Sequence, residues 1–329
     1  MPRIVRFHKT GGPEVLQFDE LPLAEPGQGE VRIKVEALGL NRAEAQFRMG
    51  LYLERPHLPS RLGYEAAGVV DALGPGVQGF KIGDRVSTIP AFSQGKFGVY
   101  GESAVVPAAA VAHYPDNLSA AEGAAIWMQY LTAYGGLVEL GGLVRGEPVL
   151  ITAASSSVGL AAIQIAKRLG AVAIATTRGP GKKDLLLQAG ADHVVVTDQE
   201  NVSQRTKTIT DGKGVRLIFD AVGGPFVEKL AKAASPGGTL IIYGLLSMEP
   251  TPFPLGQALA KGLTLRGYTL FEISGFPDKL NRAKQFVYEG LESGALVPRI
   301  DRTFPLDQIA EAHRYLEASQ QVGKIVVTV

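Results

Sequence analysis

The stretch that decides the fold reads VLITAASSSVG and spans residues 149–159. Its start, Val149 to Thr152, is a short apolar run typical of a buried strand, and Val158 to Leu169 has helical periodicity and ends at Gly170. The small residues between them let the backbone approach a pyrophosphate, and the free amides at a helix start supply positive potential. Only Gly159 fits the usual G-x-G-x-x-G spacing, so a dinucleotide site is favoured and a plain strand–helix turn stays open.

The chain that follows this stretch alternates strands with helices. Lys182 to Ala189 is a predicted helix that ends at Gly190, and helical segments separate most of the predicted strands. These strands are Val149–Thr152, Val172–Thr176, Val194–Thr197, Leu217–Val222, Thr239–Tyr243 and Thr264–Leu270. The alternation is typical of an α/β fold with a doubly wound parallel sheet.

The end of the second strand indicates which dinucleotide would bind. The strand ends at Thr177 and Arg178, Lys182 and Lys183 follow, and no carboxylate appears before Asp184. Proteins that bind NAD often place an acid there for the ribose hydroxyls, whereas cations and hydroxyl groups suit the 2′-phosphate of NADPH. We therefore expect NADPH as the cofactor, and a solvated surface loop is the alternative interpretation.

The first third of the chain is β-rich. Val31 to Ala37 alternates apolar and polar residues, which is typical of a half-buried strand. Further short strands are expected at Ala66–Ala72, Gly83–Val86, Ser103–Val106 and Val111–Tyr114. Because glycine and proline turns separate them, we expect a compact, barrel-like β domain.

The pattern changes near Ser119, which forms a predicted capping box with Glu122 at the start of a helix. The tail mixes structural types. It contains predicted helices at Pro277–Ser293 and Pro305–Ala318 and a predicted strand at Lys324–Val329.

The composition is that of an ordinary globular protein and excludes several kinds of site. The 329 residues are 46% hydrophobic and 20% charged, with 33 basic and 32 acidic side chains and a net charge of +1. The absence of cysteine excludes disulfides, thiolate nucleophiles, iron–sulfur clusters and cysteine-bound zinc. A nearly neutral chain lacks a broad basic field, and no segment is apolar enough for a signal core or a membrane span. We expect a cytoplasmic protein that binds neither nucleic acid nor membranes.

Several ordered motifs carry a resemblance that covers nearly the whole chain. They are Gly63–Val70, Gly74–Val77 and Phe80–Val86, Leu40–Glu44 through Gly50–Tyr52, Gln129–Ala133, Ala153–Gly159 and Gly323–Val327. Together they resemble the medium-chain dehydrogenase/reductase superfamily, and the best match is its zinc-free quinone oxidoreductase (zeta-crystallin-like) branch.

This resemblance implies an architecture. Residues 1–122 and 272–329 would form a GroES-like β domain, residues 123–271 would form a Rossmann NADPH-binding domain, and the active site would lie in the cleft between them. Members of the family commonly form homodimers by pairing their Rossmann sheets edge to edge, so a homodimer is expected.

Two departures from the family pattern bear on the chemistry. Asn41 stands where zinc-dependent relatives carry their first cysteine, and Tyr64 stands where they carry a histidine. No metal is therefore expected, because a catalytic zinc normally needs three protein ligands. Ser156 and Ser157 replace the paired glycines of the phosphate-binding turn.

A metal-free site favours activated acceptors. Without a Lewis acid, hydride transfer to a plain ketone loses electrostatic help, whereas a quinone or an α,β-unsaturated carbonyl spreads the negative charge over conjugated atoms. We expect an NADPH-dependent reductase of such small molecules. The alternatives are an enoyl-thioester reductase, a metal-free alcohol dehydrogenase, or an NADPH-binding protein with little turnover, crystallin-like or RNA-binding.

The resemblance and the positions of polar residues together name the candidate site. Asn41, Tyr52 and Tyr64 are the candidate catalytic residues, although Asn41 also suits a local turn cap and both tyrosines also suit packing. Glu65 is expected to be structural. The candidate cofactor residues are Thr132, Ser155, Ser156, Ser157, Val158, Thr177, Arg178, Lys182, Tyr243, Gly244, Phe271 and Lys324. Lys324 would reach a phosphate or merely face solvent.

Overall fold

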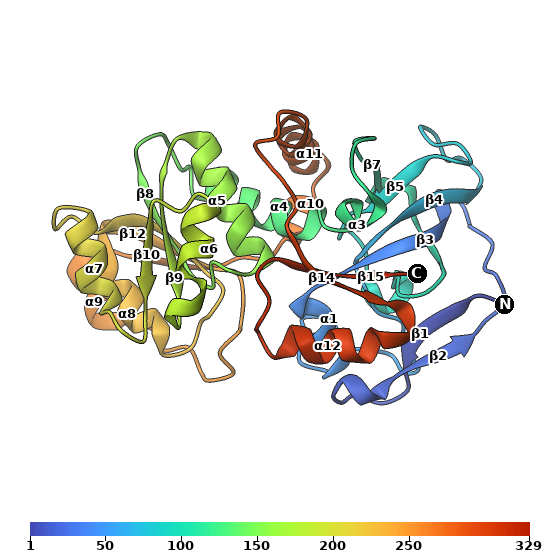
Figure 1. The fold of residues 1–329 in the computed structure, drawn as a ribbon, viewed down its shortest axis with the longest axis horizontal. Helices are drawn as coiled ribbons and strands as arrows, with labels where there is room; N and C mark the ends of the chain where they lie inside the picture. The colour runs from blue at the N-terminus through green and yellow to red at the C-terminus, as the bar shows by residue number, and fades with distance from the viewer. The chain divides into compact units, whose positions relative to one another are not determined.

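The computed structural model describes all of residues 1–329 and divides into two units. The first unit is Met1–Met128 with Pro298–Val329, and the second is Gln129–Val297. Both ends of the chain therefore belong to the first unit (Figure 1).

The second unit is built on a six-stranded parallel sheet. Its strands, in spatial order, are β10 (His193–Val196), β9 (Val172–Thr177), β8 (Pro148–Ile151), β11 (Val215–Asp220), β12 (Ala234–Ile242) and β13 (Thr264–Gly267). The chain thus starts in the middle, moves outward to one edge, and returns to build the other half. This is the strand order of doubly wound dinucleotide-binding sheets, so the predicted fold class is confirmed.

Helices precede, connect and follow these strands, and they cover both faces of the sheet. They are α4 (Trp127–Tyr134), which runs on into η3 (Gly135–Leu140), α5 (Ser157–Leu169), η4 (Pro180–Lys182), α6 (Lys183–Gln188), α7 (Val202–Ile209), α8 (Phe226–Ala233), α9 (Leu255–Lys261), α10 (Phe271–Ser274) and α11 (Pro277–Glu292). Figure 1 shows α5 and α6 on one side of the sheet and α8 and α9 on the other. Leu150, Ile218 and Leu240 from neighbouring strands form the core with Val227 and Leu230 of α8.

The first unit contains a seven-stranded sheet and a separate hairpin. The hairpin consists of β1 (Arg3–Phe7) and β2 (Leu16–Glu20). The strands of the sheet, in spatial order, are β14 (Ile300–Pro305), β15 (Lys324–Thr328), β3 (Glu30–Leu40), β4 (Glu65–Leu73), β5 (Arg85–Thr88) and β7 (Val111–His113). The seventh strand, β6 (Ser103–Pro107), pairs with β3. One edge of β3 pairs with β4, and its other edge pairs with β6 and then with β15. The last strand of the chain therefore completes the sheet of the first unit.

Short helices join the strands of the first unit. They are η1 (Pro13–Val15), α1 (Arg42–Arg48), α2 (Gln94–Phe97), η2 (Ala108–Ala110), α3 (Ala120–Gly123), η5 (Leu306–Gln308) and α12 (Ile309–Glu317). The predicted capping box is present, because Ser119 accepts from the amide of Glu122 and Glu122 accepts from the amide of Ser119. No helix in the protein combines the length and the apolar character that a membrane crossing requires.

The structure differs from the sequence expectations in the tail. Residues 272–297, which the resemblance placed with the first domain, belong to the second unit, and residues 123–128, which it placed with the Rossmann domain, belong to the first. Arg168 of α5 lies 4.0 Å above the ring of Phe286 in α11, and Arg282 of α11 is ion-paired with Glu139 at 2.6 Å. The predicted helix at 305–318 begins later, at Ile309, because Pro305 ends a strand that pairs with β15.

Candidate active site

The turn between β8 and α5, residues 153–159, is here called the phosphate turn. Ser156 caps α5 by accepting a hydrogen bond of 3.0 Å from the amide of Gly159. A side chain at Gly159 would place its Cβ 2.6 Å from the carbonyl oxygen of Ala153 and from Cα of Ala154. The helix therefore packs directly on the turn, as the last glycine of such motifs requires.

Ala153 adopts a backbone conformation that glycine normally fills. Its φ is +46°, in the left-handed region, and this is the position where the family pattern has its first small residue. The turn thus keeps the shape of a glycine-rich turn although its sequence is built from alanine and serine.

A cationic loop lies beside the phosphate turn, at the end of β9. The ammonium of Lys182 lies 3.4 Å from the hydroxyl of Ser155, and the hydroxyl of Thr177 donates to the carbonyl oxygen of Gly179 at 3.3 Å. Arg178, between them in sequence, is exposed. Lys182 reaches the phosphate turn because the turn and the loop follow β8 and β9, which are neighbours in the sheet.

The end of β11 contributes a buried carboxylate that the sequence analysis missed. Asp220 accepts a hydrogen bond of 2.6 Å from the hydroxyl of Thr152, and its two oxygens also accept from the amides of Val222 and Gly223 at 3.0 Å each. Thr152 in turn accepts from the amide of Ala221 at 2.9 Å. These bonds join the ends of β8 and β11, between which the strand order reverses and ligands bind in such sheets. The available signal was a polar residue at the end of each of two apolar strands.

Tyr243 and Gly244 follow β12 at the same edge of the sheet. The ring of Tyr243 stacks on Phe219 with centroids 4.0 Å apart, and burial raises the pKa of its hydroxyl above the usual range. A Cβ on Gly244 would lie 2.6 Å from the carbonyl oxygen of Ala221, so only glycine fits this close approach.

Two further candidate cofactor residues lie in other parts of the second unit. Thr132 is buried in α4, and Phe271 begins α10 and is half-buried. Both lie outside the phosphate turn, and their contact with a nicotinamide stays a prediction.

In the first unit, four polar side chains form what we call the buried cluster: Asn41, Glu44, Glu65 and Lys324. The ammonium of Lys324 is ion-paired with Glu65 and donates to the side-chain oxygen of Asn41 at 2.6 Å. The amide nitrogen of Asn41 donates to Glu65 at 3.1 Å and to Glu44 at 3.2 Å. All four side chains are almost completely buried.

The buried cluster changes the interpretation of two candidate residues. Lys324 is 1% exposed and neutralises Glu65, so in this structure it neither faces solvent nor reaches out to a phosphate. Asn41 takes the capping position of α1, because its backbone amide donates to Glu44 at 2.6 Å while both ends of its side chain are engaged. Glu65 acts as a structural residue, as expected, and also accepts from the amide of Met128 at 2.9 Å.

Glu44 is the second residue that the sequence analysis missed. Burial raises the pKa of its carboxyl to about 7, although Lys324 and its bond to Asn41 act in the opposite direction. It accepts a hydrogen bond of 3.2 Å from the amide of Tyr64 and thereby connects the buried cluster to that residue. Its signal in the sequence was its place three residues after Asn41, as in a capping box.

Tyr52 and Tyr64 lie together, with ring centroids 6.4 Å apart. Burial raises the pKa of the Tyr52 hydroxyl to about 12, against the opposite effect of its hydrogen bond with Tyr64. Burial also raises the pKa of Tyr64 above its usual range. Both hydroxyls therefore keep their protons at neutral pH, and because one proton is used in the hydrogen bond between them, the pair has one hydroxyl proton left to donate.

The positions that carry zinc ligands in metal-dependent relatives hold Asn41 and Tyr64 in this chain. The amide of Asn41 is used within the buried cluster, and Tyr64 stays a protonated phenol. Across residues 1–329, no three histidine, aspartate or glutamate side chains are grouped as metal ligands would be.

Comparisons with known proteins connect both units to described families. Residues 27–116 match the family described as alcohol dehydrogenase GroES-like domain, and residues 157–285 match the family described as zinc-binding dehydrogenase. A quinone oxidoreductase of Pseudomonas aeruginosa is 36% identical over 99% of this chain and 99% of its own length. Human quinone oxidoreductase is 34% identical over 99% of this chain and 97% of its own length. The crystal structure of Escherichia coli quinone oxidoreductase complexed with NADPH has a TM-score of 0.92 at 32% identity and covers 99% of this chain and 100% of that one.

Proposed function

We propose that this chain, which belongs to the quinone oxidoreductase branch of the medium-chain dehydrogenase/reductase superfamily, uses NADPH to reduce quinones or α,β-unsaturated carbonyl compounds. The observation that carries the proposal is the cationic loop after β9. Lys182 reaches the phosphate turn at Ser155, and exposed Arg178 lies in the same loop. Such a loop suits a 2′-phosphate, which an acid in this place would repel.

The residues of the second unit fit NADPH. The phosphate turn offers the amides of Ser157 and Val158, the first two of α5, together with the hydroxyls of Ser155 and Ser157, while the amide of Gly159 is bonded to Ser156. A Cβ added at Gly179 or at Gly181, on either side of Pro180, would meet no other atom within 4 Å, which leaves space beside Lys182 for a phosphate. We expect Thr177, Arg178 and Lys182 to hold the 2′-phosphate and the serines to hold the pyrophosphate.

The chemistry divides between the cofactor and the chain. Bound NADPH supplies a hydride from its nicotinamide ring. Tyr52 and Tyr64 have protonated, mutually hydrogen-bonded hydroxyls at neutral pH, and we propose that this pair donates one hydrogen bond to an acceptor oxygen as it gains negative charge. No group on the chain stands out as a proton donor, so the proton that completes the reduction is expected from solvent.

A screen of acceptors tests the proposed reaction. NADPH oxidation is followed with quinones, enones, enals, enoyl thioesters and simple ketones, and the reverse reaction is followed with simple alcohols. We expect the largest kcat/KM with a quinone or an enone. Faster turnover with simple ketones and alcohols than with every activated acceptor would contradict the proposal, because neither tyrosine replaces a Lewis acid.

We also propose that two copies of the chain pair through β13. This strand ends the sheet of the second unit, so one of its edges is unpaired. Exposed apolar side chains gather in the segment before it: Leu245, Leu246, Met248, Phe253, Leu255 and Leu259. Light scattering after size-exclusion chromatography should give twice the 34.8 kDa of one chain. Replacing Phe253 and Leu259 by Asp should give a folded monomer, and a monomeric parent protein would contradict the proposal.

A further inference from the structure

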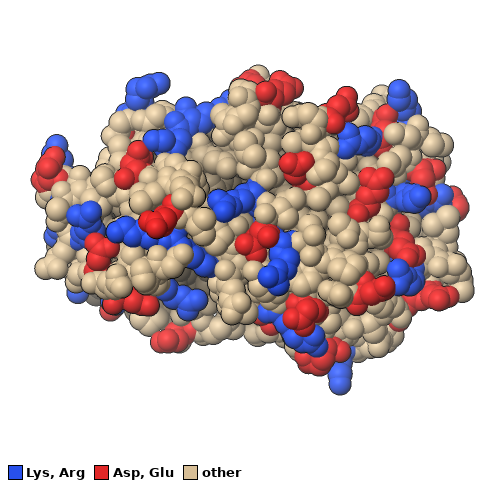
Figure 2. All heavy atoms as spheres, in the orientation of Figure 1, with Lys and Arg blue, Asp and Glu red and all other residues tan.

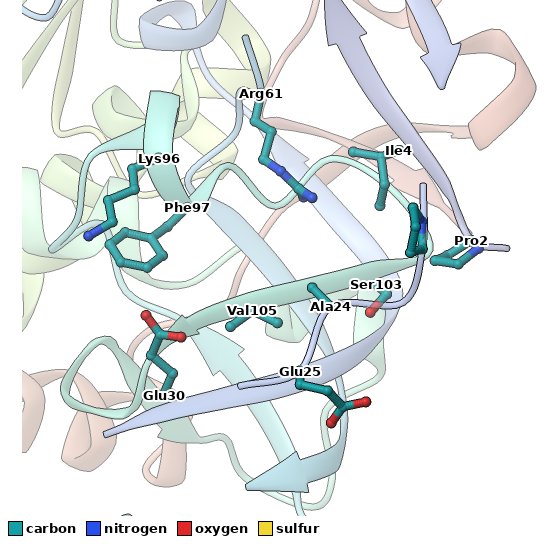
Figure 3. Close-up of a pocket in the computed structure, with 11 residues that line it drawn as sticks. Pro2, Ile4, Ala24, Glu25, Glu30, Arg61, Lys96, Phe97, Ser103 and Val105 are labelled. Carbon is teal, nitrogen blue, oxygen red and sulfur yellow. The ribbon is translucent and has the colours of Figure 1, made fainter. Parts of the chain in front are cut away.

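A pocket of about 230 Å³ lies in the first unit and includes none of the residues discussed above as catalytic or cofactor-binding. Its walls come from β1, the chain between β2 and β3, the chain before β4, α2 and β6. Figure 3 shows the guanidinium of Arg61 pointing into this pocket and the ring of Phe97 on one side of it, while the ammonium of Lys96 points away from Arg61. This volume is below that of typical sites for drug-sized ligands, so the pocket suits a small molecule.

Arg61 carries a positive charge that no group in the protein neutralises. Its side chain is half-buried and makes no hydrogen bond and no ion pair. Burial and the nearby Arg6 lower the pKa of the Arg61 guanidinium. Arg6 is itself satisfied, since it binds Asp19 at 3.1 Å and the carbonyl oxygen of Pro59 at 2.9 Å. A half-buried and uncompensated cation costs free energy that an anion in the pocket would recover.

Lys96 supplies a second free cation. Its ammonium lies 4.7 Å from the centre of the Phe97 ring, and no carboxylate lies within ion-pair distance. Lys96 is exposed and its ammonium points away from Arg61, so it adds positive charge at the rim of the pocket, whereas Arg61 is half-buried and points inward.

The two carboxylates that line the pocket are already engaged. Glu25 is ion-paired with Arg32 at 3.2 Å, and Glu30 accepts from the amide of Gly27 at 2.9 Å. The acids are therefore bound to other groups, while both cations remain available. The charges of the pocket favour an anion, and the two acids disfavour a second negative charge on it.

We propose that this pocket binds a small organic carboxylate, held by Arg61, attracted by the charge of Lys96 at the rim and covered by the apolar wall of Ile4, Phe97 and Val105. The planar guanidinium of Arg61 matches a carboxylate through two parallel hydrogen bonds. A doubly charged phosphate fits less well, because its second charge would face Glu25 and Glu30.

Fluorine NMR with 4-fluorobenzoate as the probe tests this site. The full chain is saturated with NADPH so that the cationic loop after β9 is occupied, and the ionic strength is held constant. We expect concentration-dependent broadening of the probe signal, no broadening of neutral 4-fluorobenzamide, and weaker displacement of the probe by inorganic phosphate than by benzoate. Absence of broadening with 4-fluorobenzoate, or equal broadening with the amide, would overturn the proposal, as would tighter binding of phosphate.

Single substitutions test whether the probe binds in this pocket. Arg61→Gln should weaken probe affinity about tenfold, which corresponds to about 1.4 kcal/mol, and Lys96→Gln should weaken it about threefold. Arg55→Gln, which removes an exposed arginine outside the pocket, should leave it unchanged. Unchanged affinity in both Arg61→Gln and Lys96→Gln would overturn the proposal. The readout is independent of the proposed reductase activity, and repeating it with Arg178→Gln separates this pocket from the cofactor site.

Discussion

At the scale of residues, the buried cluster is the feature on which the stability of the first unit most depends. It holds two carboxylates and one ammonium out of contact with water. Charges of this kind are tolerated only when each has a partner, and Lys324 is the one cation of the four side chains. Its position on the last strand of the chain therefore ties that strand chemically to β4 and to the cap of α1.

Removal of the Lys324 charge should destabilise the protein strongly. Lys324→Met leaves Glu65 and Glu44 buried without a cation, and breaking such a pair costs about 3–5 kcal/mol. Urea unfolding at neutral pH measures the loss. Lys34→Met, which changes an exposed lysine on β3, should be nearly neutral. Equal stability of the two variants would contradict the role given to the cluster.

His313 should make stability depend on pH. It is completely buried, both ring nitrogens lack hydrogen-bond partners, and burial beside Arg48 lowers the pKa of the imidazole to about 3. The unfolded chain, with an ordinary histidine pKa near 6.5, binds the proton better, so stability falls as the pH drops below about 6.5. Between about pH 7 and pH 5 this group contributes a loss of about 2 kcal/mol.

The difference between variants isolates this effect. His313→Leu should lose less stability than the parent protein over that pH interval, measured by urea unfolding at each pH. His57→Gln, at an exposed position, should follow the parent. Parallel pH curves for His313→Leu and the parent would show that the imidazole is not responsible.

Arg178 should decide between the two nucleotides. Arg178→Gln removes a cation from the loop that is expected to hold the 2′-phosphate, so affinity for NADPH should fall about tenfold while affinity for NADH stays the same. Arg205→Gln, which changes an arginine on α7, serves as the control. An unchanged NADPH-to-NADH preference in Arg178→Gln would refute the assignment of this loop.

At the scale of elements, the phosphate turn works through contact between backbone atoms. Gly159→Ala would force Cβ against the backbone of Ala153 and Ala154 at 2.6 Å, so α5 must move away from the turn. We expect weaker NADPH binding by about tenfold or more and a lower melting temperature. Gly256→Ala, at a helical glycine of α9 with open space around it, should bind NADPH normally. Normal NADPH binding by Gly159→Ala would show that the turn tolerates a shifted helix.

Elements with strong local patterns were predictable from the sequence. The strand and helix on either side of the phosphate turn lie within one residue of their predicted bounds, because apolar periodicity and the glycine at 170 define them locally. Strands β1, β2 and β14 were not predicted. Apolar and polar residues alternate only weakly in β14. This strand forms because it pairs with β15, and a local stretch of sequence does not indicate such a partner.

Only part of the candidate site was predictable from the sequence. Residues of the phosphate turn and the loop after β9 could be named, since their chemistry follows directly from two adjacent strand ends. The buried cluster could not, because Asn41 and Lys324 are 283 positions apart and meet only through the pairing of β15 with β3. Lys324 consequently looked like a free cation in the sequence.

At the scale of the whole molecule, the candidate residues for the cofactor and those for the acceptor belong to different units. Apart from Lys324, the candidate cofactor residues lie in the second unit, and the candidate acceptor residues lie in the first. The amphipathic pattern of the helix at 277–292 would suit packing on either unit. Its contacts with Arg168 and Glu139 show that it packs on the second unit. On the face that Figure 2 shows, Lys and Arg are interspersed with Asp and Glu, in keeping with the nearly neutral net charge.

The residues of the second unit should select NADPH over NADH. Isothermal titration of the full chain with NADPH and with NADH, in the same buffer, tests it most directly. We expect NADPH to bind at least about tenfold more tightly than NADH, a difference of about 1.4 kcal/mol. Equal or tighter binding of NADH, or no binding of either nucleotide, would contradict it.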